Sequence, residues 1–386
     1  MEVKAPKRIK TQEQEEDRIS LLSDRLIIEE ILPRLESTKS AIRTGALSKR
    51  WRHLWPLVPS LHFTDYSFKK LHPFFISKPL PEFYTSVDKT LDQCKFKNLK
   101  KFSVSANYCF YFESDVDKWI QFVISCKVQN FHMDLNYKHF TDQFVFEDES
   151  FFINSHFTHL HLEHCLFYPT GPISWNNLTH LTISYARLDH DLIEDILSGS
   201  PVLDTLRLVD CYGYLWINVT SKSVKNLVFH GYNNLDDKSD NLEDVIEINA
   251  PYIKSLKICG YLLLWKLVLR DVSSLVKAEL DYTKMGYNEM TSKVEREEML
   301  KRFILRLHHV KELKIGIDCY TVFSRLEAKG FIFPSSLKVV KVDYPIYDTD
   351  STELGDSSDS DSSVGDTAVD SEEDILLDDW SWRGRG

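Results

Sequence analysis

Apolar residues recur in a six-residue pattern along most of the chain, at the first, fourth and sixth positions of each copy. The fourth and sixth positions lie on the same side of an extended strand, because side chains alternate with period two. The pattern therefore predicts a series of short strands, each with one face in a core. Copies begin at Val58, which is divergent, and at Leu99, Val128, Phe157, Leu178, Leu203, Val224, Ile253, Leu275, Val310 and Leu337.

The spacing of these copies predicts the architecture. From Leu99 onward they start 21 to 35 residues apart, close to the period of about 20–29 residues in leucine-rich repeats, with one longer insertion. Helical stretches such as 192–197, which a Gly-Ser-Pro stop follows, are expected between the strands. We predict an α/β solenoid over residues 57–345, with a parallel sheet on the concave face and helices outside. The alternative is an ordinary α/β domain with coincidental alternation.

Residues 17–56 have a helical period instead, with apolar positions three or four residues apart. Ser23 is expected to cap the first helix, and Pro33 limits regular helix beyond Leu32. A second helix is expected from about Thr38, and a third after Ser48. The apolar stripe of the first helix consists of Leu22, Leu26, Ile27, Ile31 and Leu35.

Two tryptophans, Trp51 and Trp55, belong to this short unit. About forty residues cannot build much core alone, so the unit needs a partner or a neighbouring domain. The tryptophans are either anchors of a protein interface or residues that pack against the repeat domain. Spacing alone does not separate these two interpretations.

Three motifs connect this unit with a known family. They are Asp17-Arg18-Ile19-Ser20, Leu47-Ser48-Lys49-Arg50-Trp51-Arg52-His53-Leu54-Trp55 and Val58-Pro59-Ser60-Leu61-His62-Phe63. In these motifs, residues 17–63 resemble the F-box of plant F-box/leucine-rich-repeat proteins. Together with the repeats, the resemblance covers residues 17–345. The family's Leu-Pro pair before the first helix is Leu22-Ser23 here.

The resemblance implies the substrate-recognition subunit of an SCF (Skp–cullin–F-box) E3 ubiquitin ligase, which is not itself an enzyme. The F-box would bind a Skp-type adaptor, and through it a cullin and a RING protein, while the repeats hold an unidentified protein target. Proline pre-sets the backbone at a helix start, so Ser23 leaves a second interpretation, a non-ligase interaction scaffold with a degenerate F-box. The positions that the resemblance assigns to the adaptor are Leu22, Leu26, Ile31, Leu32, Leu35, Ala46, Trp51 and Leu54.

The net charge of -11 is concentrated near the C-terminus. Residues 348–379 contain ten Asp, three Glu and no Lys or Arg, a charge of -13, so the remainder sums to +2. Bulk charge therefore gives no reason to expect nucleic acid or an anionic membrane as a partner. Residues 346–386 are expected to form a disordered acidic tail, and residues 1–16 a disordered N-terminus.

Cysteine usage and missing motifs narrow the functional classes further. The seven cysteines are scattered and form no CxxC pair, which indicates a reducing compartment, the nucleus or the cytoplasm. No apolar run approaches the roughly 20 residues that cross a bilayer. The sequence has no phosphate-binding or hydrolase motif, and we expect no cofactor.

Histidines 156, 159, 161 and 164 precede Cys165 and raise the question of a metal site. His159 and His161 flank a buried position on the solvent side of a predicted strand, and His180 repeats the position of His159. With no acidic or CxxC partner expected, we predict no metal. The third and fifth strand positions form the predicted target-binding face, represented by His159, His161, His180, Thr182, Arg207, Asn226, Lys257 and Glu279.

Overall fold

The computed structural model describes residues 19, 21–65, 80–94, 99–137, 143–233, 245–264, 266–284, 289–334 and 338–341. The chain divides into two units, residues 1–347 and 348–386, and every described residue belongs to the first. The expected disordered segments, 1–16 and 346–386, lie outside the described residues. In the described part, no helix is long and apolar enough to cross a membrane.

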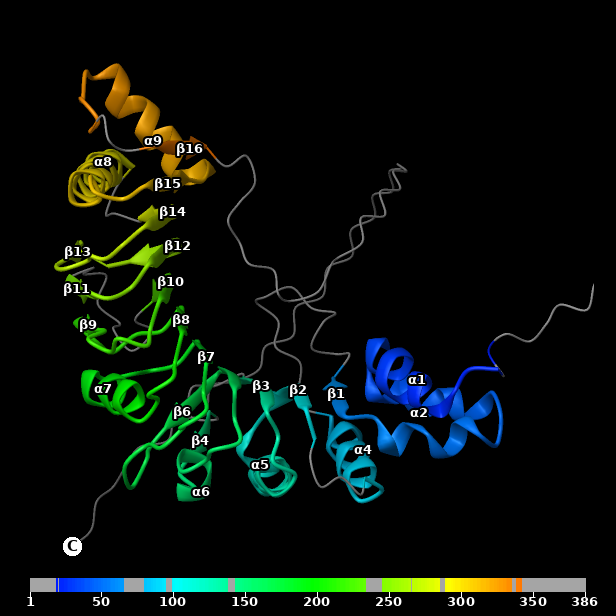
Figure 1. The fold of residues 1–386 in the computed structure, drawn as a ribbon. Coiled ribbons are helices and arrows are strands. Elements are labelled where there is room, and N and C mark those ends of the chain that lie inside the picture. Colours follow the sequence, from blue (N-terminus) through cyan, green and yellow to red (C-terminus); the bar gives the residue numbers. More distant parts are fainter. Residues whose placement is uncertain are drawn as a thin grey trace, which may run out of the picture. The chain divides into compact units, whose positions relative to one another are not determined.

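The described part of the chain begins with a helical unit made of short segments (Figure 1). Helix α1 (Asp24–Leu26) continues into a π-helical turn, Ile27–Ile31, and a 3-10 turn, Leu32–Arg34. Helix α2 (Thr38–Arg43) continues into a 3-10 turn, Thr44–Ala46. The predicted break at Pro33 is thus present as a change of helix type.

Serine caps define both helix starts, as predicted for the first. The Ser23 hydroxyl accepts a hydrogen bond from the amide of Leu26, and the Ser37 hydroxyl accepts one from the amide of Ser40. The third helix differs from its prediction, because it consists of two 3-10 turns, Trp51–His53 and Trp55–Leu57. Pro56, inside the second turn, has no amide hydrogen with which to continue an α-helix.

Eleven of the described strands form one parallel sheet, and they follow each other in chain order (Figure 1). Each strand corresponds to one predicted copy of the six-residue pattern, so the repeat prediction is confirmed. In the copy that begins at Phe157, for example, Leu160 and Leu162 are buried while His159, His161 and Glu163 lie on the other face. The strands are β1 (Ser60–Thr64), β2 (Lys101–Tyr108), β3 (Asn130–Tyr137), β5 (His159–Glu163), β7 (His180–Ser184), β8 (Thr205–Val209), β10 (Asn226–Asn233), β12 (Ser255–Leu263), β14 (Lys277–Lys284), β15 (Glu312–Ile315) and β16 (Val339–Lys341).

The register of the last strand differs from the predicted repeat. The pattern places Val340 opposite Leu313, but the structure pairs Leu313 with Val339. Two adjacent valines lie between Lys338 and Lys341, so alternation alone does not decide which valine takes the core position.

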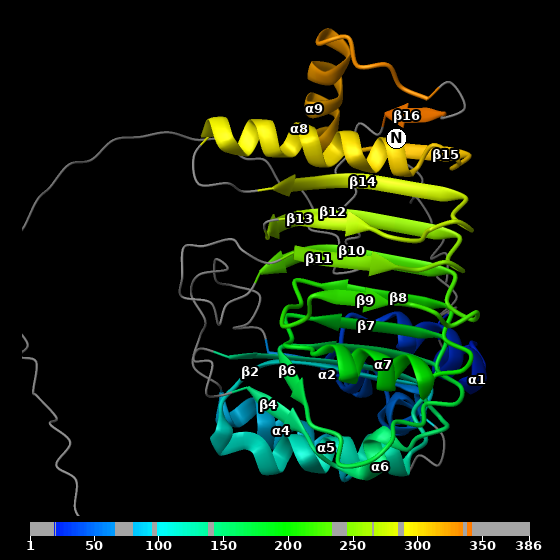
Figure 2. The ribbon, with the colours of Figure 1, turned by 90° about the vertical axis from the view of Figure 1, so that its left-hand side faces the viewer.

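An outer layer covers the side of the sheet opposite the concave face (Figures 1 and 2). Its helices are α4 (Pro81–Leu91), α5 (Glu113–Ser125), α6 (Glu149–Phe152), α7 (His190–Ser198), α8 (Glu289–Arg306) and α9 (Ile317–Ala328). Its strands are β4 (Phe144–Phe146), β6 (Cys165–Phe167), β9 (Trp216–Asn218), β11 (Val245–Asn249) and β13 (Lys266–Leu269). The helix predicted over 192–197 is α7, with Gly199 as its C-cap.

The expectation of a helix in every repeat is wrong. The copies that begin at Phe157, Leu203 and Ile253 are 21, 21 and 22 residues long, and in their described residues the outer element is a short strand. An extended strand advances about 3.3 Å per residue against 1.5 Å for a helix. A repeat with few residues therefore spans the distance back to the next inner strand only if its outer segment is extended.

A left-handed turn recurs at the same place in five successive repeats. His164, Tyr185 and Asp210 have φ of 59°, 52° and 48°, and Gly231 and Gly260 have φ of 67° and 78°. The amide of each of the first three donates to the carbonyl of the residue that precedes the turn in the next repeat, as Asp210 does to His230 at 2.7 Å. The turn thereby joins neighbouring repeats.

Two separate hydrophobic cores lie in the described residues. The helical unit buries Ile27, Leu32, Ala41, Trp51, Leu54, Trp55 and Val58. The solenoid core begins at Leu61 and continues to Leu326, and the half-buried Cys94 packs against both cores. The division into domains between residues 56 and 57 remains a prediction.

Candidate functional site

The helical unit exposes large apolar side chains although it has a closed core. Leu21 is 77% exposed, Leu47 is 66% exposed and Leu26 is 41% exposed. In the described part of the unit, the exposed large apolar residues are Ile19, Leu21, Leu26, Ile42, Leu47 and Leu57. They come from α1, α2 and the segments beside them, so one small unit offers many apolar side chains to a partner.

The eight residues that the resemblance assigned to an adaptor differ in their burial. Leu26 and Ala46 are exposed, and Leu22, Ile31 and Leu35 are half-buried. Leu32, Trp51 and Leu54 lie in the core of the unit, each at most 6% exposed. Trp55 is buried beside them, so in this structure both tryptophans pack inside the protein.

An ion pair and a cap fix the start of α1. The Arg50 guanidinium lies 2.6 Å from the Asp24 carboxylate and also donates to the Leu22 carbonyl. Ser23, which replaces the family's proline, supplies the capping oxygen for Leu26 at 3.3 Å. The helix therefore starts at the expected residue without a proline.

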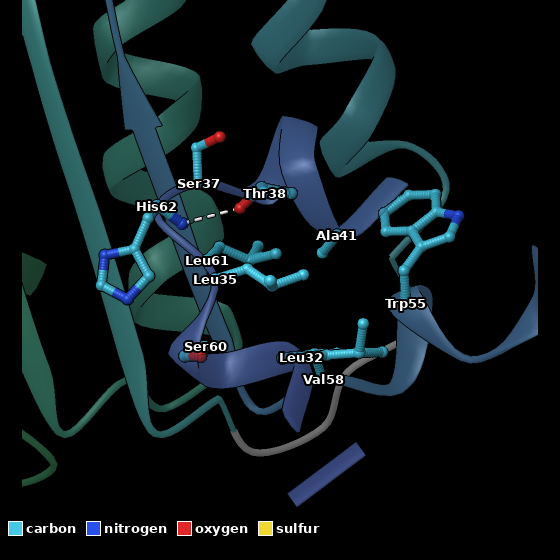
Figure 3. Close-up of a pocket in the computed structure, with 10 residues that line it drawn as sticks. All are labelled: Leu32, Leu35, Ser37, Thr38, Ala41, Trp55, Val58, Ser60, Leu61 and His62. Carbon is cyan, nitrogen blue, oxygen red and sulfur yellow. Dashed lines mark hydrogen bonds between the residues drawn. The ribbon is translucent and has the colours of Figure 1, made fainter. Parts of the chain in front are cut away.

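A small pocket lies where the helical unit meets the first strand (Figure 3). The amide of His62 on β1 donates a 2.7 Å hydrogen bond to the Thr38 hydroxyl on α2, across this pocket. Burial, with smaller contributions from Lys101 and His132, lowers the pKa of His62 to about 4. The pocket is lined by Leu32, Leu35, Ser37, Thr38, Ala41, Trp55, Val58, Ser60, Leu61 and His62.

The predicted target-binding residues share the face of the inner sheet that the outer layer leaves uncovered. They stand in two rows along the strands, because the register aligns equivalent positions of successive repeats. The third-position row contains His159, His180 and Asn226, and the fifth-position row contains His161, Thr182, Arg207, Lys257 and Glu279. The rows extend from β5 to β14, so they form an extended surface and do not meet at one point.

Neighbours in these rows contact each other. The rings of His159 and His180 stack with centroids 4.4 Å apart, and burial together with His180 lowers the pKa of His159. Farther along, the Lys314 ammonium lies 3.3 Å from the Glu279 carboxylate. The face is therefore polar and titratable, with imidazoles at one end and ion pairs at the other.

One cluster on this face contradicts the expectation that no acidic side chain accompanies the histidines. Glu163 Oε1 lies 3.1 Å from His161 Nε2 and 3.3 Å from His132 Nε2. Burial by itself raises the pKa of Glu163, but hydrogen bonds from His132 and His161 outweigh it and hold this pKa well below its usual range. The carboxylate is therefore ionised at neutral pH.

A second pair adjoins this cluster. His164 Nδ1 lies 2.8 Å from Asp134 Oδ1, and the His164 ring stacks on Tyr185 at 4.5 Å. Donor atoms of Asp134, Glu163 and His164 lie within 4.8 Å of one another. Two carboxylates and three imidazoles therefore meet where β3 and β5 run side by side.

Sequence reasoning missed His132 and the exposed Leu21, Ile42 and Leu47 as candidate site residues. For His132 a signal was present, because it is the fifth residue of its copy and therefore aligns with His161. For the three apolar residues no sequence signal was sufficient, because the same residue types fill the core of the unit.

Comparison with known proteins shows relatives over most of the chain. Residues 90–315 match the family model described as At1g61320/AtMIF1, LRR domain. F-box protein At5g03100 of Arabidopsis thaliana is 30% identical over 303 residues, which cover 77% of this chain and 88% of that protein. F-box/LRR-repeat protein At5g02910 of the same plant is 30% identical over 332 residues, which cover 84% of this chain and 65% of that protein.

These relatives, the eleven-stranded repeat sheet and the N-terminal helical unit lead to the same assignment. The chain belongs to the plant F-box/leucine-rich-repeat protein family.

Proposed function

We propose that this protein is the substrate-recognition subunit of an SCF-type E3 ubiquitin ligase. The helical unit, residues 17–56, would bind a Skp-type adaptor that connects to a cullin and a RING protein. The solenoid, residues 57–345, would bind a target protein on its inner face. The observation that carries the proposal is the exposure of Leu21, Leu26 and Leu47 on a unit whose core is already closed.

The burial pattern assigns two roles within the helical unit. Leu26 and Ala46, with the half-buried Leu22, Ile31 and Leu35, are available for contact with the adaptor. Leu32, Trp51 and Leu54 support that surface from inside, because a buried side chain holds helices together and does not reach a partner. We add Leu21, Ile42 and Leu47 to the contact set.

The capped start of α1 supports binding of the adaptor and argues against the alternative, a non-ligase interaction scaffold. A proline is useful at this point because it restricts the backbone before the helix begins. Here the Ser23 cap and the Arg50–Asp24 ion pair hold the same segment. Local contacts therefore hold the helix start at which the family has a proline, which supports the F-box interpretation.

The mechanism is one of proximity. The ligase chemistry belongs to the partners, and this chain supplies binding and geometry. A target held on the inner face has its lysines at high local concentration near the activated ubiquitin, once the helical unit is bound to the adaptor. The hydrogen bond between His62 and Thr38 and the packing of Cys94 against both cores connect the two binding surfaces.

The test is binding of the full chain to a purified Skp-type adaptor by titration calorimetry. Leu26→Asp and Leu47→Asp should each weaken binding by about 30-fold or more, as at an interface hot spot. Leu305→Asp is the matched control, because Leu305 is an exposed leucine on α8, 50% exposed, far along the chain. It should bind like the wild type.

Circular dichroism shows whether each variant is folded. Folded wild-type protein that fails to bind the adaptor would overturn the ligase proposal and leave the interaction-scaffold alternative. Equal weakening in Leu305→Asp would show a nonspecific effect of the charge.

A further inference from the structure

The inner face of the sheet holds a triad of metal-binding side chains where β3 and β5 are neighbours. His132 lies directly opposite His161 in the register, and Glu163 follows two residues later on the same face. Their donor atoms, two imidazole nitrogens and one carboxylate oxygen, all lie within 4.8 Å of one another. We propose that His132, His161 and Glu163 bind one divalent transition-metal ion of the zinc type.

The distances suit a tetrahedral ion. Zinc bonds to imidazole nitrogen and carboxylate oxygen are about 2.0–2.1 Å long, so two ligand atoms of a tetrahedral site are about 3.3 Å apart. Glu163 Oε1 lies 3.3 Å from His132 Nε2 and 3.1 Å from His161 Nε2. Both distances from the carboxylate oxygen therefore match the spacing between ligand atoms of a tetrahedral ion.

The surroundings of the triad hold it in place. The His132 and His161 rings stack with centroids 4.5 Å apart and planes 29° from parallel. On its other side, His132 Nδ1 lies 2.9 Å from the Ser103 hydroxyl on β2. A partner on the second ring nitrogen orients a metal-binding imidazole and leaves Nε2 available for the ion.

Charge and exposure also favour a cation. The Glu163 side chain is 19% exposed and that of His132 is 25% exposed, so little water competes for them. Asp134, whose carboxylate is within 4.8 Å of Glu163 and His164, adds a second negative charge beside the site. His161 is 40% exposed, which leaves a fourth coordination position open toward the inner face.

The chemical types of the three ligand groups indicate which metal ion they would bind. Two imidazoles and one carboxylate suit zinc and its transition-metal neighbours, whereas magnesium and calcium prefer sites made of oxygen alone. In the alternative, Glu163 accepts hydrogen bonds from the two imidazoles and binds no ion. Both arrangements produce similar distances, so the experiment must measure the ion itself.

The test is a calorimetric titration of the full chain, without a polyhistidine tag and freed of metal by a chelator, with Zn²⁺. Excess Mg²⁺ in the buffer occupies the carboxylates of residues 348–379. We expect one Zn²⁺ per chain, and at least about tenfold weaker binding in both Glu163→Gln and His161→Gln. His180→Gln is the matched control, because His180 stacks on His159 on the same face, and it should bind Zn²⁺ like the wild type.

A second readout separates the proposed coordination from loose surface binding. Co²⁺ in place of Zn²⁺ should give the visible absorption bands of a four-coordinate ion in the wild type and lose them in Glu163→Gln. Zn²⁺ should also raise the melting temperature of the wild type, since a ligand that binds only the folded state stabilises it. Absence of stoichiometric binding, or binding that survives in both triad variants, would overturn the proposal.

Discussion

The backbone amide of His62, on the first strand of the solenoid, donates a 2.7 Å hydrogen bond to the side-chain hydroxyl of Thr38, on helix α2 of the F-box unit. Thr38 is 5% exposed and His62 is half-buried, so the bond is partly shielded from water. A contact between residues 24 positions apart thus connects the F-box to the repeat domain that follows it.

Thr38→Val should weaken this junction. Valine keeps the shape of threonine but leaves the His62 amide without its acceptor, which costs about 1–3 kcal/mol when a buried donor is unpaired. Urea unfolding at neutral pH measures the loss of free energy of unfolding. Thr38→Ser keeps the hydroxyl and should lose clearly less. Equal losses in both variants would show that the methyl group, and not the hydrogen bond, stabilises the junction.

Trp51→Ala should destabilise the F-box unit from within. Trp51 is 6% exposed in the core of that unit, and truncating a buried tryptophan costs about 3–5 kcal/mol. Leu57→Ala is the control, because Leu57 is 57% exposed and surface changes usually stay within about 0.5 kcal/mol. Thermal unfolding followed by tryptophan fluorescence and circular dichroism compares them. A Trp51→Ala protein as stable as Leu57→Ala would contradict the buried position.

Gly231→Ala should disturb the left-handed turn inside β10, the seventh strand of the repeat sheet. Gly231 has φ of 67°, and a Cβ there would lie 1.8 Å from the Asp210 carboxylate. We expect a loss of more than about 1 kcal/mol, the cost of the left-handed conformation plus that of displacing Asp210. Gly330→Ala separates the two effects, since Gly330 has φ of 80° with nothing near its Cβ position. Chemical denaturation should show the smaller loss in Gly330→Ala.

Acid should weaken the protein partly through His62. Burial lowers the pKa of folded His62 to about 4, against about 6.5 in the unfolded chain. The full stability is present above pH 6.5. As the pH falls toward 4, the unfolded state takes up a proton that the folded state does not, so stability falls by at most about 1.4 kcal/mol per pH unit. Urea titrations at pH 7 and 4.5 should show a smaller decrease in His62→Gln than in the wild type.

Thiol labelling should distinguish Cys109 from the other cysteines. Cys126, Cys165, Cys211, Cys259 and Cys319 are buried, and burial raises the pKa of the half-buried Cys94 to about 12. In the folded protein at pH 8, only Cys109 should react quickly with an aromatic disulfide reagent, since the thiolate is the reactive form. All seven should react in denaturant. The fast phase should disappear in Cys109→Ser.

The sequence by itself determined the repeat architecture. Each copy carries its own apolar positions, so the alternation within six residues specified the buried face of each strand without knowledge of its neighbours. The serine cap at Ser23 and the helix α7 with its stop at Gly199 were likewise predictable, because their signals are local. The resemblance of residues 17–63 to an F-box added the family, which the relatives confirm.

Tertiary structure decided everything that depends on contacts between distant segments. The helical stripe could not separate Leu26 on the surface from Ile27 in the core, because both are apolar residues of one amphipathic segment. The outer strands β6, β9 and β13 followed from the space available to short repeats, and the last register followed from pairing with β15. Glu163 meets His132, 31 positions away, only because parallel strands from successive repeats lie side by side, and no pattern within a single strand contains that neighbour.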